Sequence, residues 1–253
     1  MNNSSMSVVN EAQNPQTLIK TAIILAAGFG KRMRPLTATR PKPLVEVGGK
    51  PLIDHALSHL KESGIKHVIV NTHYMSDQLE AHLAHSAKDF DLQISREKEQ
   101  PLETGGGIKQ ALPLVKEDLF LVISSDNFWL DGTANSIDLL TRHWDDNLMD
   151  ALLLLVPLSH ACCYSGQGDF HMNGTGQIKS RVEGRVAPFV FSGIQLMSKR
   201  FLDNTPDGPF RSKLIRDQAI ARGRLYGLVH DGVWFDVSTP KAVKITDNIL
   251  RRG

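Results

Sequence analysis

The chain reads Leu25-Ala-Ala-Gly28-Phe-Gly30-Lys31-Arg32-Met-Arg34-Pro-Leu-Thr37 where a short apolar run, Ala22–Ala26, comes to an end. A short run of this kind predicts a strand, and the glycines that follow it allow a tight turn. Backbone N–H groups in such a turn can approach phosphate oxygens closely. We therefore expect a strand that leads directly into a phosphate-binding loop.

Two common phosphate loops are excluded by particular residues. A Walker A motif requires Gly-Lys-Ser/Thr, whereas Gly30 and Lys31 are followed by Arg32. A dinucleotide fingerprint requires a third small residue and an acidic residue at the end of the second strand, whereas Met33 and Asn71 occupy those positions. A dehydrogenase-type binding domain is therefore disfavoured.

From Ala22 onward, short apolar runs alternate with amphipathic stretches. This alternation predicts an α/β fold in which helices cover a mostly parallel sheet. The predicted strands are Ala22–Ala26, His67–Asn71, Leu92–Ser95, Leu119–Ser124 and Ala151–Val156. The predicted helices are Pro51–Ser63, Ser76–Leu83, Gly107–Leu112 and Ser136–Trp144.

The pattern changes after Pro157, where closely spaced glycines predict hairpins and antiparallel strands. Phe189–Leu196 is expected to return to the main sheet. The last predicted elements are the helices Arg211–Arg222 and Lys241–Arg251 and the strands Arg224–Val229 and Val233–Val237. Because we find no repeat and no linker, we expect one domain over residues 18–253 after a disordered polar tail over residues 1–17.

Composition excludes several classes of protein. Of 253 residues, 41% are hydrophobic and 22% are charged, which is typical of a globular protein. The net charge of +2 is too small for a dedicated nucleic-acid binder. The longest apolar run, Ala151–Leu158, is far shorter than the roughly 20 residues that cross a bilayer. Two adjacent cysteines, Cys162 and Cys163, suit neither a stapling disulfide nor a zinc site, so we expect a cytoplasmic protein.

With the flanking Arg40-Pro-Lys42-Pro-Leu, the glycine loop resembles the signature of the sugar-1-phosphate nucleotidyltransferases. These enzymes make nucleotide sugars and release pyrophosphate. The resemblance implies that Ala26, Ala27 and Gly28 contact the nucleotide and that Arg32 and Lys42 act on its phosphates as catalytic residues. The alternative is that both basic side chains are ordinary solvated surface charges.

A second segment reads Leu102-Glu103-Thr104-Gly105-Gly106-Gly107-Ile108. Its three glycines would let a planar base lie against the backbone before a helix begins. The segment resembles the base-reading loop of the bacterial N-acetylmuramate-1-phosphate uridylyltransferases of peptidoglycan recycling, which implies that Glu103, Thr104 and Gly105 bind the nucleotide. Alone, the segment is equally consistent with a flexible turn that caps the next helix.

Two aspartates are candidate metal ligands. Asp126 follows the predicted strand Leu119–Ser124, at the strand end where open sheets collect ligands. In the family context, Asp126 and Asp236 would bind one Mg²⁺, and Asp126 would also contact the nucleotide. The alternative is two solvated loop carboxylates. Ser125 and Ser238 stand where the family often has glycine, so the metal geometry is expected to differ.

The sugar half of the site has a weaker pattern. By resemblance, Glu183, Ser192 and Gly193 would hold the sugar hydroxyls. The basic residue that the family has just after the acid is represented here by Arg185, which is displaced by Gly184. Arg185 is therefore a candidate for the sugar phosphate.

The resemblance as a whole implies a three-layer, Rossmann-like mixed and mainly parallel sheet with a small antiparallel sugar-binding insertion. It implies uridylyl transfer from UTP to a sugar 1-phosphate, with N-acetylmuramic acid 1-phosphate as the expected acceptor. The expected partners are these small molecules and Mg²⁺, with no nucleic acid and no membrane, and the chain is expected to be a monomer or small homo-oligomer. Thymidylyl, guanylyl or cytidylyl transfer to another sugar phosphate, and a non-catalytic nucleotide-sugar sensor or regulatory subunit, remain as alternatives.

Overall fold

The structure is a computed structural model that describes residues 19–251. The tail predicted for residues 1–17 lies outside the described residues. A single domain over residues 18–253 stays a prediction.

The elements follow one another in the predicted alternation. The strands are β1 (Thr21–Leu25), β2 (Glu46–Val47), β3 (Lys50–Pro51), β4 (His67–Thr72), β5 (Asp91–Arg96), β6 (Leu119–Ser124), β7 (Asn127–Leu130), β8 (Ala151–Pro157), β9 (Ala161–Cys162), β10 (Phe170–Met172), β11 (Ile178–Ser180), β12 (Phe189–Ser198), β13 (Leu225–Val229) and β14 (Val233–Asp236). The α-helices are α1 (Leu52–Glu62), α2 (Ser76–Ser86), α3 (Glu103–Ala111), α4 (Ser136–His143), α5 (Lys213–Ala221) and α6 (Pro240–Leu250). Short 3₁₀ turns are η1 (Lys31–Met33), η2 (Leu36–Ala38), η3 (Lys42–Leu44), η4 (Leu112–Leu114), η5 (Leu158–His160) and η6 (Lys199–Leu202).

The main sheet has a parallel core and an antiparallel extension. Strand β1 pairs in parallel with β4 on one side and with β6 on the other, and β5 pairs in parallel with β4. Strand β12 then runs antiparallel to both β6 and β8, and β13 lies beyond β8. The hairpin of β10 and β11 joins the sheet through β12. The predicted mixed α/β fold is confirmed.

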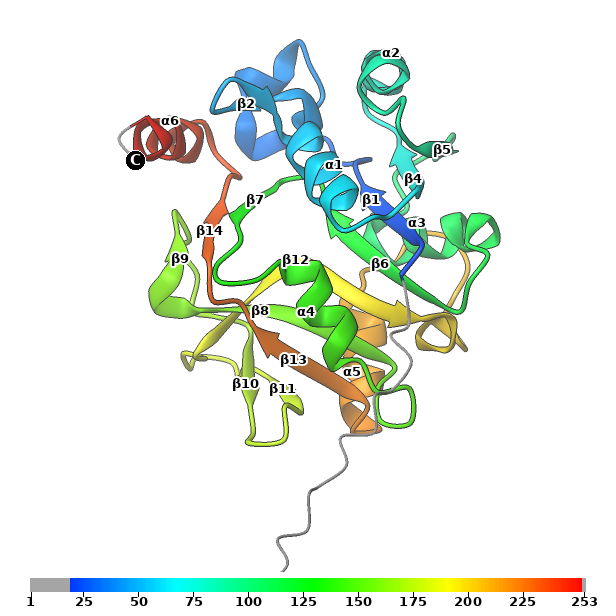
Figure 1. Ribbon diagram of the computed structural model, residues 1–253, viewed down its shortest axis with the longest axis vertical. Helices are drawn as coiled ribbons and strands as arrows, with labels where there is room; N and C mark the ends of the chain where they lie inside the picture. The colour runs from blue at the N-terminus through cyan, green and yellow to red at the C-terminus, as the bar shows by residue number, and fades with distance from the viewer. Residues whose placement is uncertain (1–18, 252–253) are drawn as a thin grey trace, which may run out of the picture.

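Helices cover both faces of this sheet (Figure 1). Side chains alternate along a strand, so Ala22 and Ile24 of β1 pack in one buried cluster with α1, α2 and α4. Ile23, which points the other way, packs in a second cluster with α3 and α5. The predicted three layers are therefore present. Within residues 19–251, no helix is both long and apolar enough to cross a bilayer.

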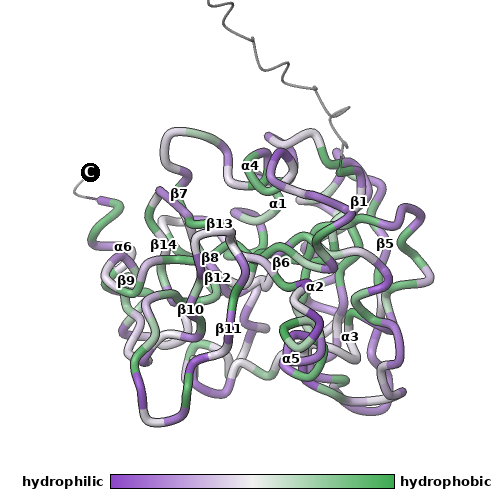
Figure 2. The backbone as a smooth tube through the Cα atoms, turned by 90° about the horizontal axis from the view of Figure 1, so that it is seen from below, coloured by the Kyte–Doolittle hydropathy of each residue, from purple (hydrophilic) through white to green (hydrophobic). Residues whose placement is uncertain are grey.

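Strand β8 is buried on both faces, as its unbroken apolar sequence predicts. Leu152 and Leu154 belong to the first cluster, whereas Leu153 and Leu155 belong to the second. Figure 2 shows hydrophobic segments of the chain near β6 and β8, in the middle of the molecule.

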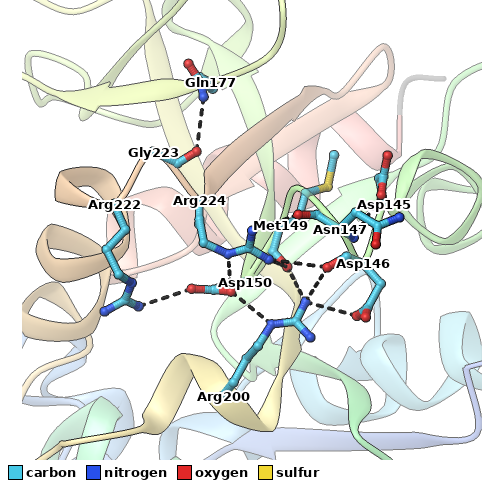
Figure 3. Close-up of polar contacts among 10 residues, drawn as sticks. All are labelled: Asp145, Asp146, Asn147, Met149, Asp150, Gln177, Arg200, Arg222, Gly223 and Arg224. Atoms are coloured by element: carbon cyan, nitrogen blue, oxygen red, sulfur yellow. Dashed lines mark hydrogen bonds and ion pairs between the residues drawn. The ribbon is translucent and has the colours of Figure 1, made fainter.

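One buried carboxylate joins three segments at the start of β8 (Figure 3). Asp150 accepts hydrogen bonds from Arg200 at 2.9 Å, from Arg224 at 2.7 Å and from Arg222 at 3.1 Å. These arginines lie in η6, before β13 and after α5, while the Asp150 side chain is only 5% exposed. The cluster therefore fixes the ends of β8 and β13 against their neighbours.

The glycine segment differs from its prediction. Helix α3 begins at Glu103, so Gly105, Gly106 and Gly107 lie inside the helix and are buried. The prediction of a glycine turn before a helix at Gly107 is wrong. A Cβ on Gly105 would lie 2.3 Å from the Phe210 ring, and one on Gly107 would lie 2.6 Å from the Asn71 amide. The glycines are thus required by close packing rather than by a loop.

Candidate active site

Lys42 and Asp126 meet where β1 and β6 end. The Lys42 ammonium donates a hydrogen bond to Asp126 Oδ2 at 2.7 Å. The two residues are 84 positions apart in the sequence, and the Lys42 side chain is only 12% exposed. The contact exists because β1 and β6 are parallel neighbours whose carboxyl ends lie at the same edge of the sheet.

The loop that carries Lys42 is held in place by its own residues. Met33 is fully buried, and the Thr37 hydroxyl donates to the Gly30 carbonyl at 2.8 Å. Gly30 has a φ of 61°, which favours glycine, and a Cβ there would lie 2.9 Å from Thr37. The prolines on either side of Lys42 are buried. Lys42 therefore extends from a fixed backbone.

Asp126 is ionised at neutral pH in this setting. Burial by itself would raise its pKa, but the ion pair and hydrogen bond with Lys42 outweigh burial and hold the pKa below its usual range. Arg32 adds to this lowering of the pKa. The carboxylate is therefore available to bind a cation.

Asp236 comes to the same place through strand pairing. Asp236 is the last residue of β14 and lies opposite Asn127 of the antiparallel strand β7. Asn127 is the residue that directly follows Asp126. Gly193, in the bulge of β12, has a φ of 84°, and a Cβ there would lie 1.9 Å from the Asn127 amide. Only glycine allows β12 to approach the Asp126 turn this closely.

Two cavities meet at this turn. The one that we name the β12 cavity measures about 550 Å³. Its lining residues are Leu25, Arg32, Glu103, Thr104, Val122, Ser124, Asp126, Asn127, Tyr164, Asp169, Val190, Phe191, Gly193, Gln195, Arg211, Ser212, Lys213, Arg216, Trp234 and Asp236.

The other, which we name the β1 cavity, measures about 440 Å³. Its lining residues are Leu25, Ala26, Ala27, Gly28, Phe29, Lys31, Lys42, Pro43, Asn71, Glu97, Pro101, Glu103, Thr104, Ser124, Ser125 and Asp126. The residues that line both cavities are Leu25, Glu103, Thr104, Ser124 and Asp126, so the two cavities share one wall.

Most of the predicted site residues are brought together here. Those on the β1 cavity are Ala26, Ala27, Gly28, Lys42, Glu103, Thr104 and Asp126. Those on the β12 cavity include Arg32, Gly193 and Asp236. Gly105 is buried behind the wall, where its N–H donates to the Phe210 carbonyl at 2.8 Å.

Three predicted sugar residues lie apart from both cavities. Ser192 is fully buried, and its hydroxyl accepts a hydrogen bond from the Ile194 N–H at 3.2 Å. Glu183 and Arg185 lie on an exposed turn before β12. Glu183, Arg185 and Ser192 line neither cavity. The predicted contact of these residues with the sugar or its phosphate stays a prediction.

The serines that replace family glycines do not strain the backbone. Among the described residues, the non-glycine positions with positive φ are Met75, Glu103, Cys163 and Asn204. Ser125 and Ser238 are not among them, and both are buried. The turn at Asp126 therefore accommodates serine without a left-handed conformation.

A buried polar chain beside the β1 cavity escaped the sequence analysis. Asn71 accepts a hydrogen bond from the Ala26 N–H at 2.6 Å and donates one to Glu97 at 2.7 Å. The other oxygen of Glu97 accepts from the Leu102 N–H at 2.7 Å. Burial raises the pKa of Glu97, while these two hydrogen bonds act against it. The chain fixes the loops on both sides of the cavity, and the polar Asn71 inside an apolar strand was its one visible signal.

Comparison with known proteins identifies the family that has this arrangement. A family model described as "Nucleotidyl transferase" matches residues 21–180 of the chain. The chain belongs to the nucleotidyl transferase family. This nucleotidyl transferase is a sugar-1-phosphate nucleotidyltransferase, and family membership implies a nucleoside triphosphate and a sugar phosphate as substrates.

Relatives of this nucleotidyl transferase share most of its length. The N-acetylmuramate alpha-1-phosphate uridylyltransferase of Caulobacter vibrioides is 39% identical over 226 residues, which are 88% of this chain and 93% of that protein. The Neisseria meningitidis enzyme of the same description is 35% identical, over 86% of this chain and 93% of that protein. Mannose-1-phosphate guanyltransferase beta-A of Xenopus laevis is 30% identical, over 87% of this chain and 61% of that protein. The predicted resemblance is confirmed.

Solved structures show the same fold. A UDP-glucose pyrophosphorylase complexed with UDP-glucose superposes with a TM-score of 0.75 at 17% identity, covering 92% of this chain and 99% of that one. HddC from Yersinia pseudotuberculosis, complexed with GMP-PN, superposes with a TM-score of 0.73 at 21% identity, covering 92% of this chain and 100% of that one. At these identities the likeness concerns the fold alone.

Proposed function

We propose that this nucleotidyl transferase transfers the uridylyl group of UTP to N-acetylmuramic acid 1-phosphate, forming the UDP-sugar and pyrophosphate. The observation that carries the proposal is the junction of two cavities at Lys42 and Asp126, combined with the two bacterial relatives at 39% and 35% identity. Such a reaction fits peptidoglycan recycling in the cytoplasm.

The two cavities suit the two substrates. The β1 cavity is lined by Ala26, Ala27 and Gly28 and suits the nucleotide, with Glu103 and Thr104 near the nucleotide's base. The β12 cavity, which has carboxylates, aromatic rings and Gly193 in its wall, suits the sugar. Both substrates would then place their phosphates at the shared wall, beside Asp126.

The carboxylates at this wall fit Mg²⁺. Asp126 and Asp236 line the same cavity and offer hard oxygen ligands, although Oδ2 of Asp126 also accepts from Lys42. Within residues 19–251, no group of three or more His, Cys, Asp or Glu side chains forms a complete metal cage. A two-carboxylate site agrees with a cation that takes its remaining ligands from phosphates and water. When bound, Mg²⁺ neutralises charge on the nucleotide phosphates.

The chemistry requires positioning more than proton transfer. A phosphomonoester has a second pKa near 6, so the sugar phosphate is mostly a dianion at neutral pH and serves as the nucleophile without a general base. Its oxygen attacks the α-phosphorus of UTP, and the bond to the β-phosphate oxygen breaks, which releases pyrophosphate. Lys42 stabilises charge at the α-phosphate, and Arg32 stabilises the leaving pyrophosphate.

The proposal is tested by pyrophosphate release with Mg²⁺ and N-acetylmuramate 1-phosphate, comparing UTP, dTTP, CTP, GTP and ATP. We expect release with UTP to exceed release with the other nucleotides by at least about tenfold in kcat/KM. Release only with glucose or mannose 1-phosphate would contradict the proposed acceptor. A folded protein that binds nucleotide but releases no pyrophosphate with any pair would instead support a sensor.

A further inference from the structure

The guanidinium of Arg216 lies in the wall of the β12 cavity, and no ion pair with it forms within residues 19–251. Arg216 belongs to the first turn of α5 and lines the β12 cavity but not the β1 cavity. One nitrogen donates to the Ser212 hydroxyl at 2.9 Å, and the group lies 5.1 Å from the centre of the Phe191 ring. Among the described residues, no carboxylate oxygen comes within the 4.0 Å that defines an ion pair.

Neighbouring cations in the same wall behave differently. Arg211 is 3.6 Å from Glu103 and its side chain is 79% exposed, whereas Lys213 pairs with Asp217 and is 68% exposed. Burial lowers the pKa of Arg216, and the charges of Asp169 and Asp217, which raise it, only partly oppose burial. Asp169, which lies in the same cavity wall, uses Oδ2 to accept the Phe191 N–H at 2.9 Å. Arg216 therefore presents an unpaired planar cation to whatever fills this cavity.

We propose that Arg216 binds a carboxylate carried by the sugar, and thereby selects an acidic sugar 1-phosphate over its neutral parent. This role rests on the proposed function, whose acceptor differs from N-acetylglucosamine 1-phosphate by a lactyl ether that ends in a carboxylate. A guanidinium matches a carboxylate with two parallel hydrogen bonds. Its partial burial makes a bound carboxylate worth more than it would be at an exposed surface.

The element that carries Arg216 favours this role over phosphate binding. The wall that the two cavities share includes Asp126, so the reacting phosphates belong at that junction. Arg216 lies only on the β12 cavity, on the wall formed by α5 and by Phe191 of β12. Arg32 and Asp236 also line only the β12 cavity, but Arg32 comes from the glycine loop after β1, and Asp236 lies opposite Asn127, the residue after Asp126. Helix α5 carries no predicted phosphate or metal residue, so a cation on α5 suits the body of the sugar rather than its phosphate.

The test compares N-acetylmuramate 1-phosphate with N-acetylglucosamine 1-phosphate in wild type, Arg216→Met and Arg216→Lys. Dissociation constants are measured by calorimetry, and kcat/KM is measured with UTP. In Arg216→Met we expect the acidic sugar to lose about 10- to 100-fold in affinity and in kcat/KM, the range of one charged hydrogen-bonded pair. The neutral sugar should change less than about threefold, and Arg216→Lys should fall between the two proteins.

Lys244→Met is the control, since Lys244 is an exposed helical cation of α6 that lines neither cavity. We expect it to leave the affinity and the kcat/KM for both sugars unchanged. If Arg216→Met lost the same factor in affinity and kcat/KM for both sugars, Arg216 would have a phosphate-binding or structural role, and the inference would be overturned. An Arg216→Met protein with unchanged affinity for the acidic sugar would also overturn it. A wild type that binds the acidic sugar through Arg216 but makes no UDP-sugar would contradict the proposed function and leave the role of Arg216 intact.

Discussion

Glu103 holds a left-handed backbone conformation, with a φ of 60°, at the wall that the two cavities share. Glycine adopts this conformation freely, whereas other residues are strained there by about 1 kcal/mol. The ion pair of Glu103 with Arg211 is exposed and offers little in return. A residue with a strained backbone, placed where two cavities meet, indicates a role in binding rather than in folding.

For Glu103→Gly we therefore expect a higher melting temperature and a lower kcat/KM. Relief of strain should raise the midpoint by about 2 °C. Asn204→Gly is the control, because Asn204 has a φ of 59° and lines neither cavity. It should raise the midpoint slightly without changing activity. Full activity in Glu103→Gly would contradict a binding role.

At the scale of an element, α3 depends on the absence of side chains. The N–H groups of Gly105 and Gly106 both donate to the Phe210 carbonyl, at 2.8 and 3.1 Å. Alanine inside a helix normally stabilises by about 1 kcal/mol relative to glycine. At Gly105 this gain is opposed by a contact of 2.3 Å with the Phe210 ring.

We expect Gly105→Ala to destabilise the protein by about 1 to 3 kcal/mol, the usual cost of overpacking. Urea denaturation measures this change. Gly174→Ala is the matched control, since a Cβ there would meet nothing within 4 Å and its φ is not positive. That variant should stay within about 0.5 kcal/mol of wild type. Equal midpoints for the two variants would contradict the packing role of α3.

The elements themselves could largely be predicted from the sequence. Leu119–Ser124 is predicted and observed with the same bounds, because a buried parallel strand is an unbroken apolar run. The start of α3 could not be predicted, because glycines favour a turn locally. Close contacts with Phe210, Gly208 and Asn71 are what require glycine inside this helix. Local propensity was overridden by packing against distant residues.

At the scale of the whole molecule, Asp150 joins η6, α5 and β13 to the start of β8 (Figure 3). Burial alone would raise the pKa of Asp150, but its three arginines hold the pKa below the usual range. The Asp150 carboxylate therefore stabilises the folded protein fully at pH values above about 3.9, the ordinary pKa of an aspartate. This stabilisation is lost as the pH falls through the lower pKa that Asp150 has in the folded protein.

We expect Asp150→Asn to destabilise the protein by about 2 kcal/mol at pH 7, because three arginines lose a buried partner. The difference in the free energy of unfolding between wild type and Asp150→Asn should become smaller as the pH falls below about 4. Urea denaturation midpoints of both proteins, measured from pH 7 to below about pH 4, test this expectation. Asp89→Asn removes an exposed pair with Lys61 and should leave the midpoint nearly unchanged. A constant difference across the range would contradict the electrostatic account.

Site residues were predictable where a local motif carries them. Lys42 and Asp126 each follow a distinctive motif, although their 2.7 Å contact could not be predicted from either motif. Glu97 and Arg216 lie in ordinary charged sequence and become distinctive only through burial and through neighbours far along the chain. Their roles depend on tertiary placement.

The most direct test of the reaction centre follows UTP and N-acetylmuramate 1-phosphate by ³¹P NMR with Mg²⁺, in wild type and in Asp126→Asn. Wild type should convert both into UDP-sugar and pyrophosphate, and Asp126→Asn should stay folded but turn over at least about 1,000-fold more slowly. Unchanged turnover in a folded Asp126→Asn protein would contradict the claim that the reaction takes place where the two cavities meet.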